Sequence, residues 1–237
     1  MKKATQQLLE SAPLVVGTVH SAGSIQAAAK LKAGDVDVLE FRIDALADRL
    51  DAAERAMKNA RFPALLTVRH PDEGGLNKLD TKRRKELYRR FLPHAAFIDV
   101  ELRSLPAFSD IVAEARDAGC AIIVSNHDFK KTPPAKLLIQ REKRAYVEGA
   151  DVFKLACVAA TAHDLALLLG FTARPAKWPR SVMGMGRFGR ASRLALAEAG
   201  SVLNYGYLHE ANAPGQWEAR ELRRLLADVR AGKNGGH

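Results

Sequence analysis

The chain has 237 residues, of which 47% are hydrophobic and 27% are charged, and its formal net charge is +10. This length suits one large domain or two small ones, with enough apolar residues to bury a substantial core. No apolar run approaches the roughly 18 residues that a membrane-spanning helix needs, so a membrane protein is excluded.

The excess of basic residues is compatible with two kinds of partner. It would attract nucleic acid, but it would equally draw a small carboxylate substrate toward a cleft. No nucleic-acid-binding motif is recognised, and 6% aromatic residues are too few for a base-stacking platform. Two basic runs, 82–85 and 141–144, lie in expected helices and are predicted to be solvated helix faces. We therefore expect no nucleic-acid partner.

The cysteines and the first residues indicate the compartment. Cys120 and Cys157 are both flanked by apolar residues, which is typical of buried thiols in a reducing environment. Met1 and the two lysines after it are followed by polar residues, not by the apolar segment of a signal peptide. The expected location is the cytoplasm.

Short β-branched runs recur along the chain, and stretches with helical periodicity separate them. In chain order the expected elements are strand 14–19, helix 24–33, strand 36–43, helix 48–59, strand 64–69, helix 81–91, strand 97–102, helix 107–118, strand 121–127, helix 134–148, strand 152–158, helix 162–169, strand 181–185, helix 190–199, strand 201–208 and helix 216–230. Pro134 is expected in the first turn of its helix. Glycines at 34, 119, 149 and 200 follow helical stretches and are expected to end them.

Strict alternation of strands and helices favours a parallel sheet with right-handed crossovers. Eight units in this length are close to the roughly 250 residues of a TIM barrel. An open doubly wound sheet would normally carry a glycine-rich phosphate loop after the first strand, and residues 20–23 do not match one. The predicted fold is a single α/β domain over residues 1–237, a (β/α)8 TIM barrel, with a flexible tail at 231–237.

Charged residues recur on one face of several expected strands. Because side chains two residues apart share a face, the polar set must oppose the apolar set that meets the helices. The residues predicted to point into the barrel are Glu40, Arg42, Asp44, Arg69, Asp99, Glu101, His127 and Lys154. Burying such groups is costly unless they pair, and polar groups at the carboxyl ends of barrel strands are typical of a catalytic site. A purely structural ion-pair network is the alternative.

The composition of this cluster indicates a reaction class. The sequence has no metal-ligand spacing, no nucleophile elbow and no phosphate-binding loop of the Walker type. What remains is Lys154, His127 and several carboxylates and arginines. A partly desolvated lysine among cations keeps its amine free to attack a carbonyl, and a protonated imine acidifies the adjacent C–H. A histidine can then take that proton at neutral pH. The pattern indicates a class I lyase or aldolase.

Local motifs make this reading more specific. The sequence resembles type I 3-dehydroquinate dehydratases in seven stretches that follow one another in the family's order, and the separation between the histidine and the lysine is kept. These stretches are 39–44, 67–69 with 73–75, 98–102, 124–129 with 132–133, 149–154, 183–186 with 192–193, and 213–216. Together they run from about residue 36 to residue 216.

The resemblance implies a role for each candidate residue. Lys154 would form an imine with the C3 ketone of 3-dehydroquinate, and His127, oriented by Glu73, would move the protons of a syn elimination to 3-dehydroshikimate. The groups implied to bind substrate are Glu40, Arg42, Arg69, Arg193, Asn212 and Gln216. Asp99 and Glu101 would support the cluster around the lysine. The resemblance implies no metal or organic cofactor and a homodimer, in either biosynthesis or quinate breakdown.

The chain departs from the family pattern in three places. Asn212 stands where the family usually has serine, Val158 and Ala159 replace a Met-Pro pair, and Phe41 replaces a tryptophan. The change at Asn212 affects a loop that would close over the substrate, so a weakly active paralogue is an alternative.

A second alternative is another Schiff-base barrel of the aldolase or transaldolase type. Such an enzyme would bind a sugar phosphate near the last two strands. Residues 184–186 with Arg187 and Arg190 could form that phosphate site.

Overall fold

The computed structural model describes residues 1–211, 213 and 215–231. Within these residues eight parallel strands form one sheet, in the order β7-β6-β5-β4-β3-β2-β1-β8. Their bounds are β1 Leu14–Val19, β2 Val38–Arg42, β3 Ala64–Thr67, β4 Phe97–Glu101, β5 Ala121–Asp128, β6 Val152–Val158, β7 Arg180–Met185 and β8 Leu203–Tyr207.

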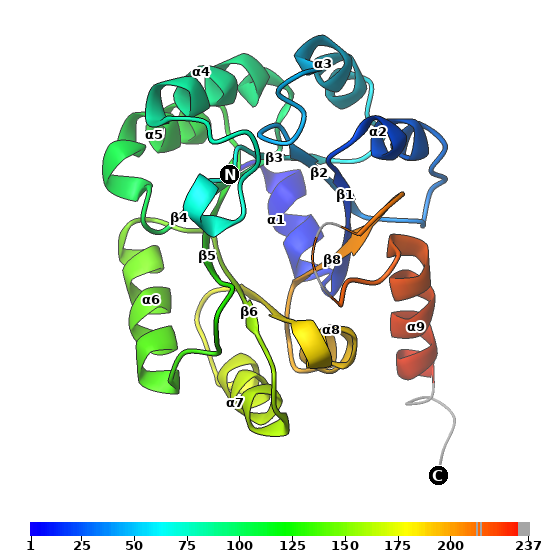
Figure 1. Cartoon of the computed structure of the whole chain (residues 1–237), viewed down its shortest axis with the longest axis vertical. Helices are drawn as coiled ribbons and strands as arrows, with labels where there is room; N and C mark the ends of the chain where they lie inside the picture. The colour runs from blue at the N-terminus through cyan, green and yellow to red at the C-terminus, as the bar shows by residue number, and fades with distance from the viewer. Residues whose placement is uncertain (212, 214, 232–237) are drawn as a thin grey trace.

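The sheet curls until its two outer strands lie side by side. The amide of Val202 donates to Arg180 O at 2.9 Å, and the Ser181 hydroxyl donates to Leu203 O at 2.6 Å. Helices surround the strands in a ring (Figure 1). The expectation of a single (β/α)8 barrel is confirmed.

The helices of the ring follow the strands in chain order. They are α2 Ala22–Ala29, α3 Leu50–Lys58, α4 Thr81–Phe91, α5 Ser109–Asp117, α6 Ala135–Val147, α7 Ala162–Ala173, α8 Gly189–Glu198 and α9 Ala219–Ala231. Short 3-10 turns lie at η1 Pro71–Glu73, η2 Leu92–His94, η3 Leu105–Ala107 and η4 Gly186–Phe188. None of the helices in the described ranges has the length and apolarity needed to cross a bilayer.

Several expected boundaries need correction. Pro134 precedes α6 as its N-cap with an extended ψ of 147°, so it lies outside the first turn. Gln216 lies in the loop before α9 and not at the start of that helix. Ala231, expected to begin a flexible tail, is the last residue of α9, and 232–237 lie outside the described residues. Gly119, Gly149 and Gly200 each follow the C-cap of a helix with a positive φ, as expected, whereas Gly34 lies in a turn beyond α2, which already ends at Ala29.

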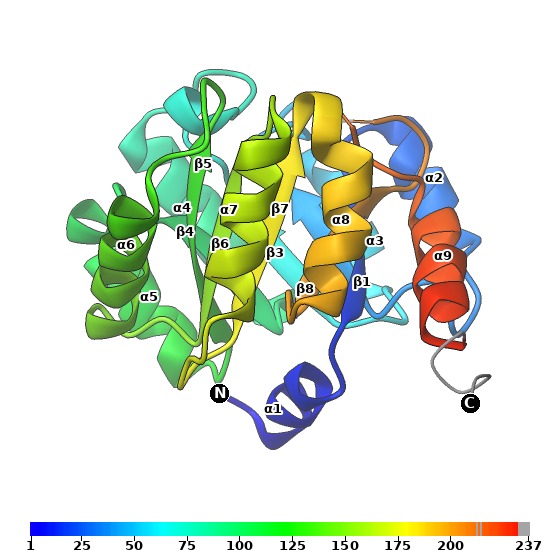
Figure 2. The same cartoon turned by 90° about the horizontal axis from the view of Figure 1, so that it is seen from below.

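One helix was not expected. Helix α1, Lys3–Glu10, precedes the first strand and lies beneath the barrel, at the end where the strands begin (Figure 2). Its Leu9 is buried and joins the apolar cluster inside the barrel, together with Leu14, Val16 and Leu203. Helix α1 therefore closes the barrel at the end opposite the carboxyl ends of the strands.

The barrel interior changes character along its axis. Near the beginnings of the strands it is apolar, with Val16 paired to Val38 and Leu65 to Phe97 in register. Two residues further along each strand, the inward-facing residues of neighbouring strands are polar, and Thr18 is paired with Glu40 and Thr67 with Asp99. A second, larger apolar cluster fills the space between the barrel and its helices. The polar layers of the barrel interior thus lie toward the end where the strands finish, on the inner face that the strand alternation predicts.

Candidate active site

A cavity of about 140 Å³ opens at the carboxyl end of the barrel. An apolar cavity of about 150 Å³ is large enough for benzene, so this volume suits a single six-membered ring. Most of the predicted site residues line it. These are Glu40, Arg42, Arg69, Glu73, His127, Lys154, Arg193 and Gln216.

Lys154 points into the barrel from β6 and its side chain is 4% exposed. Its Nζ donates to Asp99 Oδ2 at 2.8 Å and to Glu40 Oε1 at 3.3 Å. The same nitrogen lies 3.9 Å from the ring centroid of Tyr205 on β8. The expectation of a lysine among cations is therefore wrong for its direct contacts, which are two carboxylates and an aromatic face.

His127 follows on the neighbouring strand, closer to the mouth of the barrel. In the β5–β6 register Ser125 is paired with Lys154 and His127 with Ala156, one inward position further along. Glu73 Oε2 accepts hydrogen bonds from the backbone amide of His127 and from its Nδ1, both at 2.9 Å. Because an ionised carboxylate can only accept, the proton lies on Nδ1 and the lone pair lies on Nε2 while Glu73 is ionised.

The two members of this pair have shifted acidities. Burial holds the pKa of His127 well below its usual range, and the charges of Arg69 and Lys154 lower it further. Burial also raises the pKa of Glu73 to about 7, against the opposing effect of Arg69. The imidazole is consequently neutral at physiological pH, which is the form able to accept a proton.

Gly74 shapes the loop that carries Glu73. It has φ +84°, and a Cβ at this position would lie 2.7 Å from the ring of Phe129. Phe129 lines the cavity and stacks on His127 with ring centroids 6.3 Å apart. The glycine therefore allows the loop after β3 to approach the loop after β5 closely.

Asp99 and Glu101 lie behind the cavity on β4 and are fully buried. Arg69 binds Asp99 through two bonds, at 2.9 and 2.8 Å, and Glu101 through one at 3.1 Å. Glu101 also accepts from Arg84 at 2.5 Å and from the backbone amide of His70 at 2.8 Å. These contacts agree with the supporting position expected for both acids.

Arg84 is a correction to the predicted solvated run at 82–85. Lys82 and Arg83 are exposed, but Arg84 is 1% exposed and points from α4 toward the barrel. Its guanidinium also donates to Val68 O at 2.9 Å and to Ser104 Oγ at 3.2 Å. A helix of the outer ring thus contributes a charge to the network of the barrel.

Asp44 was placed on the polar face but received no role. It is fully buried, accepts two hydrogen bonds from Arg42 at 3.0 and 2.8 Å, and accepts one from the amide of Arg69 at 3.0 Å. Arg42 also donates to Gly74 O at 2.9 Å. Its direct partner is therefore Asp44 rather than Glu40, which instead accepts from Thr67 at 3.0 Å and Thr18 at 3.4 Å.

Arg193 comes from α8 and is 2% exposed. Its guanidinium donates to two backbone oxygens, Tyr205 O at 3.0 Å and Gly215 O at 3.3 Å. Among the residues that the structure describes, no carboxylate forms an ion pair with it. Burial lowers its pKa to about 10, which still leaves it charged at neutral pH. A buried cation at the cavity wall without an acidic partner is suited to hold an anion.

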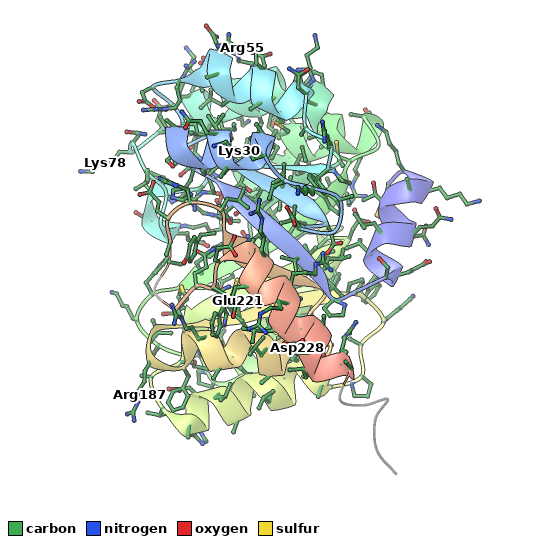
Figure 3. The ribbon with its side chains drawn as sticks, turned by 90° about the vertical axis from the view of Figure 1, so that its right-hand side faces the viewer. Lys30, Arg55, Lys78, Arg187, Glu221 and Asp228 are labelled. Atoms are coloured by element: carbon green, nitrogen blue, oxygen red, sulfur yellow. The ribbon has the colours of Figure 1, made fainter. Side chains whose placement is uncertain are left out.

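The closing loop is described in part. Gln216 is buried and lines the cavity, whereas Asn212 lies outside the described residues. Arg187 and Arg190, considered for a phosphate site, are exposed, and Arg187 extends from the edge of the molecule (Figure 3). Neither lines the cavity as far as the structure describes it, so the geometry gives the sugar-phosphate alternative no support.

Comparison with known proteins bears directly on this site. Residues 12–232 match the model of the type I 3-dehydroquinase family. The chain belongs to this family. The 3-dehydroquinate dehydratase of Hydrogenobaculum sp. is 33% identical over 199 residues, covering 82% of this chain and 89% of the relative. That of Thermococcus gammatolerans is 32% identical over 217 residues, covering 90% and 97%.

A solved type I 3-dehydroquinate dehydratase gives the same result for the fold. The crystal structure from Clostridium difficile, which contains covalently modified comenic acid, has a TM-score of 0.82 at 27% identity and covers 93% of each chain. The expected type of enzyme, a type I dehydroquinase and hence a hydro-lyase, is confirmed.

Proposed function

We propose that the chain converts 3-dehydroquinate to 3-dehydroshikimate by a syn elimination of water, through an imine between the substrate and Lys154. One observation carries the proposal: a single cavity holds a buried lysine, a neutral histidine and an arginine that forms no ion pair with the described residues. Membership of the type I 3-dehydroquinase family supports the choice of substrate.

Substrate binding begins with its carboxylate. Arg193 is buried at the cavity wall, and its backbone contacts hold the guanidinium in place before any ligand arrives. A carboxylate can be bound by two parallel N–H donors of such a group. Gln216, Glu40, Arg42 and Arg69 then surround the ring and its hydroxyls.

The imine forms at Lys154. The Nζ–C3 bond forms, the ketone oxygen leaves as water, and the positive charge of the ammonium passes to the iminium. Asp99 and Glu40 already contact this nitrogen and balance the charge in both states. Little reorganisation of the surroundings is then needed during the reaction, which lowers its barrier.

His127 performs the proton transfers. Its free Nε2 takes the C2 proton, made acidic by the adjacent iminium, and returns a proton to the C1 hydroxyl as it departs. Glu73 stabilises the imidazolium that exists between the two steps through the Nδ1 hydrogen bond. Water then releases the product and restores the amine. The covalently modified ligand in the Clostridium difficile relative supports a nucleophilic residue in such a site.

Mass measurement tests the imine. Incubating the chain with 3-dehydroquinate and borohydride is expected to reduce the imine to a stable adduct on Lys154, and absorbance is expected to rise as the conjugated product forms. Lys154→Ala should abolish both signals, while Lys136→Ala, which removes an exposed lysine of α6, should leave both intact. Turnover without an adduct, or an adduct on another lysine, would overturn the mechanism.

The setting of the enzyme is also part of the proposal. The family resemblance favours a cytoplasmic homodimer, acting either in the shikimate route to aromatic amino acids or in quinate breakdown. Sedimentation analysis measures the assembly directly, and a monomer at micromolar concentration would contradict it.

A further inference from the structure

Tyr205 lies on the inner face of β8 and was given no role by the sequence. It is 4% exposed and lines the cavity. Its hydroxyl is buried and has no hydrogen-bond partner among the described residues. An unpaired buried hydroxyl destabilises a fold, whereas phenylalanine would fill the same space without that cost. Folding alone therefore does not explain the hydroxyl.

The surrounding acids do not account for it either. Glu40 already accepts from Thr18, Thr67 and Lys154. Asp99 accepts two bonds from Arg69, one from Ser125 at 2.5 Å and one from Lys154. Both carboxylates are occupied by other donors, so the Tyr205 hydroxyl remains available to a ligand.

Tyr205 contacts both Lys154 and Arg193, which both line the cavity. The ring faces the Lys154 amine, with Nζ 3.9 Å from the ring centroid. The carbonyl oxygen of the same residue accepts from Arg193 at 3.0 Å. A ligand that contacts Arg193 and Lys154 together must therefore pass close to Tyr205.

We propose that Tyr205 is a further catalytic residue, whose hydroxyl donates a hydrogen bond to the ketone oxygen while Lys154 attacks the carbonyl carbon. This role rests on the imine mechanism proposed above. As the Nζ–C3 bond forms, the electron pair of the C=O bond moves to oxygen, where a donor stabilises it. The π face of the ring stabilises the Lys154 ammonium before this step and the iminium after it.

The step balances without a proton from Tyr205. The Lys154 ammonium and the ketone become a protonated imine and water, and both protons of that water come from the ammonium. Burial, with the charges of Glu40 and Asp99, raises the pKa of Tyr205 well above its usual range. The hydroxyl thus keeps its proton and acts as a donor of a hydrogen bond rather than as an acid.

The test isolates imine formation from the later elimination. In a His127→Ala background the substrate imine should accumulate, because the C2 proton is not removed. Timed quenching with borohydride and intact mass then give the rate of imine formation. Adding Tyr205→Phe should slow that rate roughly 10- to 100-fold, at or below the low end of what the loss of an oxyanion donor costs. The matched control is Tyr207→Phe on the same strand, which does not line the cavity as described.

A second measurement separates this role from a structural one. Since Tyr205→Phe removes an unpaired buried hydroxyl and keeps the ring, its thermal unfolding temperature should equal or exceed that of the parent. An unchanged rate of imine formation overturns the proposal, as does a fall in unfolding temperature that accompanies the slower rate. Absence of any Lys154 adduct in the His127→Ala parent would instead refute the imine mechanism itself.

Discussion

Glu73 and His127 form a hydrogen-bonded pair in which the protonation state of each side chain affects the other. Glu73 is 4% exposed, and in the proposed mechanism it stabilises an imidazolium that exists briefly. Burial raises its pKa to about 7, so Glu73 changes protonation state close to physiological pH. The carboxylate form accepts the Nδ1 proton of His127, and the acid form stabilises an imidazolium poorly.

This pair predicts the pH dependence of turnover. The rate of the elimination should fall as the pH drops through about 7, because Glu73 becomes protonated. Glu73→Gln should turn over roughly 10- to 100-fold more slowly, in line with the loss of a group that orients a histidine, and should lack this limb. Steady-state assays from pH 5.5 to 9 provide the measurement, with Asp72→Asn, an exposed neighbour, as the control. A parent rate that stays flat between pH 8 and 6 would contradict the assignment.

The free energy of unfolding should change with pH in the opposite sense to the rate of turnover. A carboxyl whose pKa is raised on folding contributes stability below its unfolded value near 4.5, and this contribution is lost as the pH rises through 7. Glutamine does not titrate, so Glu73→Gln should become more stable relative to the parent over this window. The difference should approach about 3 kcal/mol in denaturant unfolding at pH 8.

Helix α4 shows why a charge run does not define one face of a helix. Lys82 and Arg83 are exposed, whereas Arg84, Leu87 and Tyr88 are buried. The spacing of three and four residues between the buried positions continues to Phe91 and is that of a helix stripe. This stripe was available in the sequence, but a run of four basic residues obscured it. The partner of Arg84, Glu101, lies 17 positions away and could not be inferred.

Removing Arg84 is therefore expected to destabilise the whole barrel. Arg84→Met would leave Glu101 buried with one of its cationic partners missing, and breaking a buried pair in this way costs about 3 kcal/mol or more. Arg83→Met removes a neighbouring exposed ion pair with Glu86 and should cost under about 1 kcal/mol. Urea unfolding of both variants compares them, and equal midpoints would show that the buried contact contributes little.

The alternation of strands and helices could be predicted because the apolar periodicity of each strand or helix lies within its own segment. Strands β1 and β6 and helix α4 begin and end at the expected residues. Other strands were expected too long, since Ile43 and Arg69 extend the pattern of β2 and β3 but lie beyond the last ladder residues. Helix α1 was missed because it contributes few apolar residues, and its role depends on the open end of a barrel that no local pattern describes.

The features of the site also divide into those that a local sequence pattern predicts and those that it does not. Strand alternation was enough to place Glu40, Lys154 and His127 on the inner face, because that property repeats every two residues. Which acid meets which base was not predictable, since it depends on register between strands more than 25 residues apart. Arg69 meets Asp99, 30 positions away, and Lys154 meets Glu40, 114 positions away. Tyr205 gave no signal, because a tyrosine in a strand is ordinarily a core residue.

At the scale of the molecule, the charges of the network around the cavity balance, with one exception in their pairing. Among the described residues the network contains five acids and five strong bases. The acids are Glu40, Asp44, Glu73, Asp99 and Glu101, and the bases are Arg42, Arg69, Arg84, Lys154 and Arg193. Each base except Arg193 contacts an acid directly.

Binding of a ligand carboxylate to Arg193 should stabilise the entire fold. A ligand at 100 times its Kd adds about 2.7 kcal/mol to the free energy of unfolding, which corresponds to roughly 5–10 °C for a chain of this size. We expect the product 3-dehydroshikimate to raise the thermal unfolding temperature of the parent by this amount. Arg193→Gln should show little or no rise at the same concentration, because its site lacks the cation that pairs with the carboxylate. Arg190→Gln removes an exposed arginine of the same helix and should respond as the parent does. If Arg193→Gln is stabilised as strongly as Arg190→Gln, the carboxylate is bound elsewhere and the buried charge of Arg193 serves the fold alone.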